Sequence, residues 1–135
     1  MIETVLSLLN EKPIEDGISH PAESYIEEEL ESGSDVRELY SWCYKNLRSD
    51  CSSRLTGVLR CIGRLEKKVA GEEGGKLMLE ALKNSDVGVR EAAIRAFERW
   101  GGHDSIDILK KYVKFEPVNW LIDYASKVIE DPQYA

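Results

Sequence analysis

The sequence predicts an all-α fold, an α-solenoid of about three to four stacked helical hairpins with seven to eight helices in all. Three observations support this prediction. Apolar residues recur with the 3.6-residue period of a helix, and no segment alternates with period two for long enough to predict a strand. The apolar stripes fall into two series that alternate along the chain. Together they define a helical hairpin that recurs every 31–38 residues, a period typical of proteins built from stacked helix pairs.

The second helices of the predicted hairpins carry the clearest stripes. One of them lies on residues 89–100 and uses Val89, Ala92, Ala93, Ala96, Phe97 and Trp100. Because Trp100 continues this stripe, we expect it to be buried. Asp86 precedes the helix as the predicted N-cap, and Gly101 follows it as the predicted C-cap. Similar stripes begin at Leu55 and Leu121, 34 residues before Val89 and 32 residues after it.

The first helices of the hairpins form the other series. Each of these helices carries two pairs of adjacent apolar residues, one turn apart. They are Leu39/Tyr40 and Cys43/Tyr44, Leu77/Met78 and Ala81/Leu82, and Ile108/Leu109 and Tyr112/Val113. Short turns over residues 48–50, 84–86 and 114–117 connect each first helix to its second helix. Residues 71–75 combine three glycines with two acids that would repel a phosphate, so we interpret them as a loop between helices.

The N-terminal third is less regular than the rest of the chain. It predicts a short helix over residues 2–11, a loop over 12–21 and a helix over 22–32. We therefore interpret residues 1–135 as a single helical-repeat domain. In it, residues 1–35 form an irregular acidic cap and residues 36–131 form three hairpins. A charged terminal unit suits such a stack, because its outer face meets water.

Residues 79–102 contain Asp86 at the turn between two predicted helices, Val89-Arg90 at the start of the second helix, and the alanine pair Ala92-Ala93. With this pattern, the segment resembles a HEAT repeat. Residues 104–131 resemble the same pattern, with Tyr124-Ala125 in place of the alanine pair, and residues 36–67 match it only at Asp50 and Arg54.

The resemblance implies structural roles for two residues. In HEAT proteins the turn Asp and the following Arg belong to a hydrogen-bonded ladder between neighbouring repeats, so Asp86 and Arg90 are expected to hold the stack together. The class also implies a scaffold or adaptor whose second helices line a concave, partner-binding surface. A shared fold alone does not specify a function, so the site has to be argued from particular residues.

Composition favours a cytoplasmic protein without a cofactor. No apolar run approaches the ~20 residues of a membrane span, and the N-terminus lacks the basic start of a secretory signal. Cys43, Cys51 and Cys61 have no metal-binding spacing, and Cys43 lies on an apolar helix face, which predicts burial. The two histidines, His20 and His103, are expected in turns. No catalytic motif is visible, so we predict neither an enzyme nor a metal site.

The net charge of −7 is unevenly distributed. Residues 1–35 hold ten acids and one base, whereas residues 36–100 hold nine acids and thirteen bases. The acidic face predicted to bind a partner consists of Glu23, Glu27, Glu28, Glu31 and Asp35. A solvated capping helix explains the same residues without a partner. If the face does bind, its charge would steer a basic protein toward it.

An arginine ridge on two adjacent second helices is the alternative binding surface. Its residues are Arg54, Arg60, Arg64, Arg95 and Arg99. Such a ridge could hold the phosphates of a nucleic acid, but interleaved glutamates could also neutralise it. Trp120, next to the stripe that starts at Leu121, would be an interface anchor if it were exposed.

These residues predict a non-enzymatic protein–protein interaction module. The more specific hypothesis is an intracellular immunity-type inhibitor that masks a basic toxin or nuclease domain. The alternative is a small nucleic-acid-binding or HEAT-like DNA-repair protein that uses the arginine ridge, and an enzyme fragment of the HEAT-like lyase type ranks last. The sequence does not indicate an oligomeric state.

Overall fold

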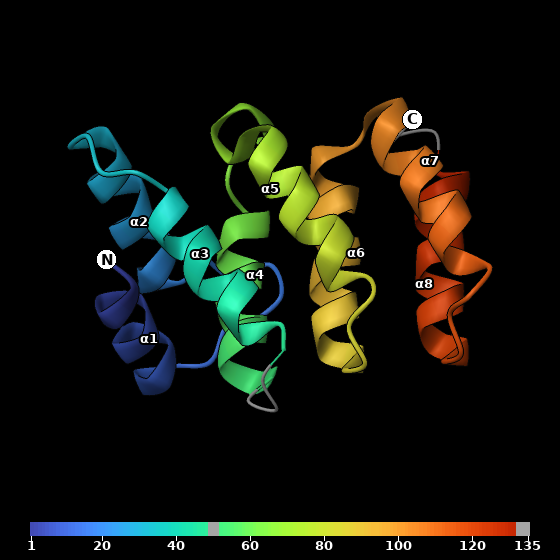
Figure 1. Cartoon of the computed structure of the whole chain (residues 1–135), viewed down its shortest axis with the longest axis horizontal. Coiled ribbons are helices and arrows are strands. Elements are labelled where there is room, and N and C mark those ends of the chain that lie inside the picture. The colour runs from blue at the N-terminus through green and yellow to red at the C-terminus, as the bar shows by residue number, and fades with distance from the viewer. Residues whose placement is uncertain (49–51, 132–135) are drawn as a thin grey trace.

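The computed structural model describes residues 1–48 and 52–131, which form eight helices and no strand. The helices are α1 (Ile2–Glu11), α2 (Pro21–Glu31), α3 (Arg37–Asn46), α4 (Ser52–Gly63), α5 (Lys67–Ala81), α6 (Val87–Trp100), α7 (Gly102–Val113) and α8 (Asn119–Glu130). The predicted all-α class is confirmed, and successive helix pairs stand side by side along the molecule (Figure 1). Asp50 and Cys51, and part of the predicted turn over 48–50, lie outside the described residues.

Two kinds of cap define the helix ends. The side chain of Asp86 accepts a hydrogen bond from the backbone N–H of Val89 at 3.1 Å, so it caps α6 as predicted. Gly101 ends α6 with a φ of 62°, in the left-handed region that favours glycine. At α2 the cap is His20, whose Nδ1 accepts from the N–H of Ala22 at 3.0 Å. This histidine cap was not predicted.

The pair of α4 and α6 forms the centre of the stack and has the closest helix packing in the described chain. Small side chains allow this approach: a Cβ on Gly63 would lie only 3.0 Å from the Cβ of Ala96. The alanine pair Ala92 and Ala93 is buried as well. At the N-terminal end, α1 packs against α2, α3 and α4 and so covers the end of the stack.

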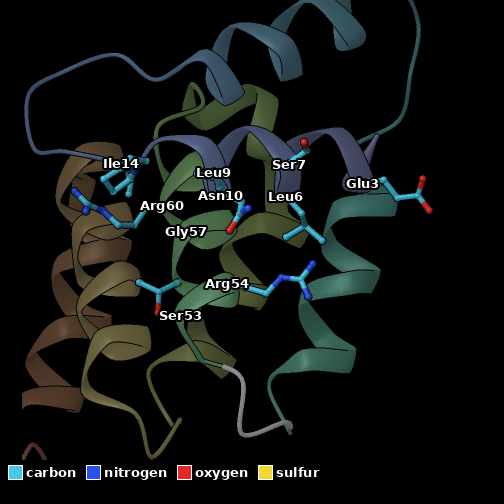
Figure 2. Close-up of a pocket in the computed structure, with 12 residues that line it drawn as sticks. Glu3, Leu6, Ser7, Leu9, Asn10, Ile14, Ser53, Arg54, Gly57 and Arg60 are labelled. Atoms are coloured by element: carbon cyan, nitrogen blue, oxygen red, sulfur yellow. The ribbon is translucent and has the colours of Figure 1, made fainter.

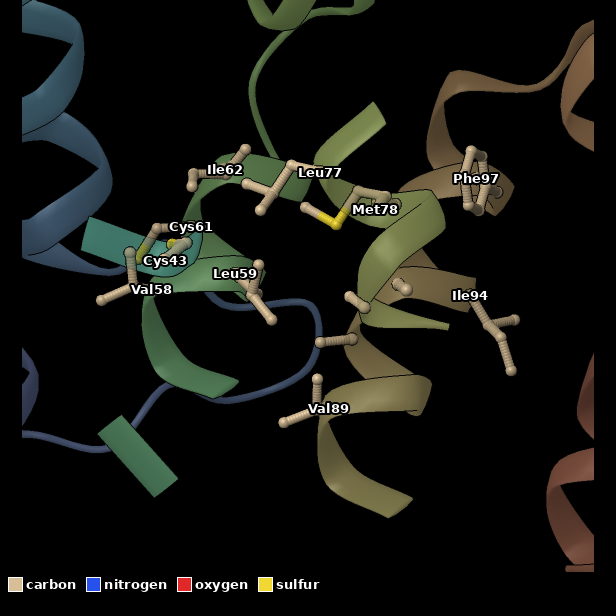
Figure 3. Close-up of a cluster of buried hydrophobic side chains, with 14 of the residues drawn as sticks. Cys43, Val58, Leu59, Cys61, Ile62, Leu77, Met78, Val89, Ile94 and Phe97 are labelled. Carbon is tan, nitrogen blue, oxygen red and sulfur yellow. The ribbon is translucent and has the colours of Figure 1, made fainter. Parts of the chain in front are cut away.

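The core runs through all the helices and contains Cys43 and Cys61. Cys43 and Cys61 lie among Val58, Leu59 and other buried side chains contributed by α3, α4, α5 and α6 (Figure 3). The predicted burial of Cys43 is confirmed. Burial raises the pKa of the Cys61 thiol to about 12, and burial also raises the pKa of Cys43. Both groups are therefore uncharged packing side chains at neutral pH.

The predicted loop over residues 71–75 is wrong for residues 72–75, which are helical and lie inside α5. Only Gly71 leaves the helical conformation, with a φ of 68° and a ψ of −174°, and it kinks the helix. The chain stays helical beyond the kink, where Gly74 packs closely against α3. A Cβ on Gly74 would lie 3.1 Å from the hydroxyl of Tyr40, which donates a hydrogen bond to the carbonyl oxygen of Ala70 at 2.9 Å.

Two further predictions need correction. His103 does not lie in a turn, because α7 begins at Gly102 and already includes it. Trp100 is only half-buried. Its indole N–H donates to the carbonyl oxygen of Leu65 at 3.0 Å, and this bond holds the ring at the edge of the core.

A buried ion pair links the last two hairpins. Arg90 donates two hydrogen bonds to the carboxylate of Glu116, from Nε at 2.7 Å and from Nη2 at 2.9 Å. The same carboxylate accepts from the Tyr112 hydroxyl and from the N–H of Val118. Arg90 thus bridges α6 to the turn before α8. This is the kind of link that the resemblance implied for Arg90, but its partner is a glutamate that the pattern did not indicate.

Asp86 is not part of that bridge, since its side chain caps its own helix. Asn84, in the same turn as Asp86, links this hairpin to the preceding one. Its Nδ2 donates to the carbonyl oxygen of Leu47 at 2.9 Å, and its own carbonyl oxygen accepts from Arg90 at 3.0 Å. A line of polar contacts therefore runs across the turns of three consecutive hairpins.

Candidate binding surfaces

The arginine ridge is brought together by the α4–α6 packing, but it is not free. Arg60 lies on α4, Arg64 directly follows α4, and Arg95 lies on α6. The loop between α1 and α2, residues 12–20, crosses these three side chains. We call residues 12–20 the strap. Arg54 and Arg99, at the two ends of the ridge, stay exposed outside it.

Three arginines hold the strap. Arg60 and Arg95 each pair with one carboxylate oxygen of Asp16, Arg95 at 3.2 Å. Arg64 donates to the carbonyl oxygens of Glu15 at 2.6 Å and Ile18 at 2.9 Å. Burial raises the pKa of Asp16, but the charges of Arg95, Arg60 and Arg64 and the hydrogen bond from Arg60 outweigh it, so that the pKa lies below its ordinary value. Asp16 and Glu23 of the acidic N-terminal third thus offset part of the charge in the middle of the ridge.

His20 and Glu23 fasten the end of the strap. Since Nδ1 of His20 accepts from a backbone N–H, its proton lies on Nε2, which donates to the carbonyl oxygen of Lys12 at 2.6 Å. The Glu23 carboxylate accepts from the N–H of His20 at 2.6 Å and from Arg64 at 2.9 Å. This arrangement closes the loop on itself and ties it to the end of α4.

The strap leads to a prediction about local order. Replacing Asp16 with asparagine removes the charge that Arg60 and Arg95 share, so the amides of residues 15–18 should exchange with deuterium faster than in the wild type. Thermal stability should change little, because exposed ion pairs contribute about 1 kcal/mol or less. Glu15→Gln is the matched control, since Glu15 uses its backbone carbonyl and not its carboxylate. Equal exchange in all three proteins would contradict the role of Asp16.

The five acids of the predicted acidic face differ in exposure and in ion pairing. Glu27, Glu28, Glu31 and Asp35 are exposed, whereas Glu23 is half-buried and engaged with Arg64. Asp35 pairs with Arg37 at 2.6 Å. Within the described residues, the carboxylates of Glu27, Glu28 and Glu31 form no ion pair. These three are the acids of the predicted face that are available to a partner.

One open groove adjoins the arginine ridge, and another lies between the first helices of the last two hairpins. The first, about 820 Å³ in volume, lies between α1 and α4 and is lined by apolar Leu6 and Leu9 and by Arg54 and Arg60 (Figure 2). The second, about 720 Å³, lies between α5 and α7, and Phe115 at its edge is 85% exposed. Neither was predicted, although an aromatic residue in a turn, such as Phe115, is a usable signal for an interface.

The described residues show no metal or membrane feature. No group of three His, Cys, Asp or Glu side chains within residues 1–48 and 52–131 is arranged to hold a metal ion. Over the same part of the chain, no helix combines the length and apolarity that a membrane crossing requires.

Comparisons with known proteins add no relative: no family model, no curated protein and no solved structure matches the chain.

Proposed function

We propose that this protein is a non-enzymatic protein–protein interaction module of the HEAT type. One feature supports the repeat class: Arg90 bridges its hairpin to the next one through Glu116. A stack held by such links presents a rigid surface, and pre-ordered surfaces lose little entropy on binding.

One observation favours a basic protein over a nucleic acid as the partner. Glu27, Glu28 and Glu31 are exposed and form no ion pair within the described chain, whereas the middle of the arginine ridge is engaged by the strap. A nucleic acid would have to displace the strap before its phosphates reached Arg60, Arg64 and Arg95. A basic protein meets unpaired carboxylates directly. The function that this arrangement favours is binding to a basic protein through the acidic face.

The more specific form of the proposal is an immunity-type inhibitor that acts in the cytoplasm and masks a basic toxin or nuclease domain. Acidic inhibitors gain fast association from complementary charge, and a net charge of −7 concentrated near the N-terminus suits that role. The alternative is nucleic-acid binding through the exposed ends of the ridge, Arg54 and Arg99.

Charge reversal tests the proposal. The protein is captured with its partners from host lysate at low salt, bound proteins are identified by mass spectrometry, and association rates are then measured with the purified partner. Reversing Glu27, Glu28 and Glu31 to lysine should slow association by about tenfold or more and flatten its salt dependence. The melting temperature should hardly change, because these side chains are exposed.

The matched control is the reversal of Arg54 and Arg99 to glutamate, which should leave the rate nearly unchanged. Binding to a fluorescent DNA or RNA duplex is measured in parallel across salt concentrations. Tight, salt-sensitive duplex binding that the arginine reversal abolishes would reject the inhibitor proposal in favour of the nucleic-acid alternative.

A further inference from the structure

The groove between α5 and α7 has an apolar floor and an apolar edge. Leu82, Ile108 and Tyr112 form the floor, and Leu79 and Phe115 stand at the edge. The exposed fractions of Leu79 and Phe115 are 37% and 85%, so both side chains remain in water. An aromatic ring that is largely hydrated in the free protein gains free energy when a partner covers it.

The groove is rigid on one side. The hydroxyl of Tyr112 donates to Glu116, and that carboxylate is held by two hydrogen bonds from Arg90. This buried network fixes the Tyr112 ring and the turn that carries Phe115. The Tyr112 ring and the turn that carries Phe115 are therefore pre-ordered, which lowers the entropy that a ligand loses when it binds there.

The surroundings of the groove are basic, in contrast to the protein as a whole. Lys83 and Lys111 line it, and an adjoining groove of about 490 Å³, which shares Leu79 and Lys83, adds Arg48 and Lys76. Two carboxylates line these grooves, and both are engaged: Glu80 pairs with Lys83 at 3.4 Å, which also offsets part of the Lys83 charge, and Glu116 is buried against Arg90. The complementary ligand is apolar on one side and negatively charged on the other.

A helix fits this surface better than a peptide that would bind as an added strand. Strand addition needs a sheet edge, and the described part of the chain contains no sheet. An amphipathic helix needs only an apolar groove, into which it inserts side chains spaced three and four residues apart. Its acidic residues would then meet the lysines at the rim.

We propose that the α5–α7 groove binds an acidic amphipathic helix of a partner protein, with large apolar side chains packed against Phe115, Leu79 and Tyr112. This surface is separate from the acidic face on α2 and has the opposite charge. The protein would thus carry two docking surfaces, one for a basic partner and one for an acidic helix.

Fluorescence anisotropy with synthetic helices tests the proposal. The probe is a fluorescein-labelled helix with leucine and phenylalanine on one face and glutamates on the other. The comparison probe has lysines in place of the glutamates. Saturable binding of the acidic probe, at least about tenfold tighter than that of the basic probe, is the expected result. No saturable binding of the acidic probe, or equal binding of both probes, would overturn the proposal.

Variants locate the site. Phe115→Ala should weaken binding of the acidic probe by about tenfold or more, as expected for an aromatic anchor. Trp120→Ala, which removes a side chain that is 50% exposed on α8, should leave binding unchanged. Lys83→Glu combined with Lys111→Glu should also weaken binding, whereas Lys68→Glu with Lys127→Glu should not. Phe115 and the four lysines are exposed, so circular dichroism and the melting temperature of their variants should match the wild type. Trp120 is half covered in the folded protein, so circular dichroism is the measurement that shows its variant is folded.

Two outcomes would reject the site. Equal losses with the groove variants and their controls would mean that the probe binds elsewhere. A Phe115-dependent dimer of the protein in sedimentation equilibrium would show that a second copy, and not an acidic helix, covers the groove.

Discussion

Replacing Glu116 with glutamine is expected to lower the free energy of unfolding by about 3–5 kcal/mol, the usual cost of leaving one charge of a buried pair without its partner. The Glu116 side chain is fully buried, and Arg90 is nearly so. A glutamine keeps the shape of the side chain but cannot neutralise the guanidinium, and it breaks the network that joins the last two hairpins. The measurement is urea unfolding followed by circular dichroism, with the midpoint and slope compared between proteins.

The control for this change is Glu130→Gln, at the exposed C-terminal end of α8. It should change the unfolding free energy by no more than about 0.5 kcal/mol. A Glu116→Gln protein that unfolds at the wild-type urea concentration would show that the Arg90–Glu116 pair does not hold the hairpins together.

The same residue makes stability depend on pH in a defined direction. Burial raises the pKa of Glu116, but the hydrogen bonds from Arg90, Tyr112 and the N–H of Val118 outweigh it, and the pKa lies below its ordinary 4.5. A carboxyl whose pKa is lower in the folded state stabilises the fold above its unfolded pKa and loses that contribution as the pH falls through its folded pKa. The melting temperature of the wild type should therefore fall more steeply below pH 4.5 than that of Glu116→Gln.

Enlarging a buried alanine is the second change with a large expected effect. Ala93 lies on α6 and is fully buried in the core. Ala93→Leu adds three carbon atoms where no solvent reaches, and overpacking of this kind costs about 1–3 kcal/mol of stability. Thermal unfolding should show a clear fall in melting temperature.

Glu91→Ala, two residues away on the same helix, is the matched control. Its carboxylate pairs with Arg95 one turn later at 3.0 Å, and such a pair is worth only about 0.2–0.5 kcal/mol. Equal, small effects of both substitutions would mean that Ala93 is not packed in the core as described.

Local signals in the sequence were enough to predict the helices and their buried faces. The stripe from Val89 to Phe97 is buried, and Asp86 and Gly101 mark the two ends of α6 as predicted. Such signals work because helix periodicity and capping involve residues within a few positions of each other. The error at residues 71–75 has a tertiary cause: a glycine-rich segment stays helical where Gly74 allows close packing against Tyr40.

Which charged side chains of the candidate surfaces are paired depends on contacts between residues far apart in the sequence, and no local sequence pattern indicates these contacts. The sequence indicated which acids and arginines cluster along the chain, and three acids of the predicted acidic face proved exposed and unpaired within the described residues. Only the tertiary structure placed Asp16 against Arg60 and Arg95, which are 44 and 79 residues away, and Glu116 against Arg90. The path of the strap and the packing of α4 on α6 decide which charges meet. Helix type and phase are thus properties of short segments, whereas the pairing of charges arises only when segments distant in sequence come together.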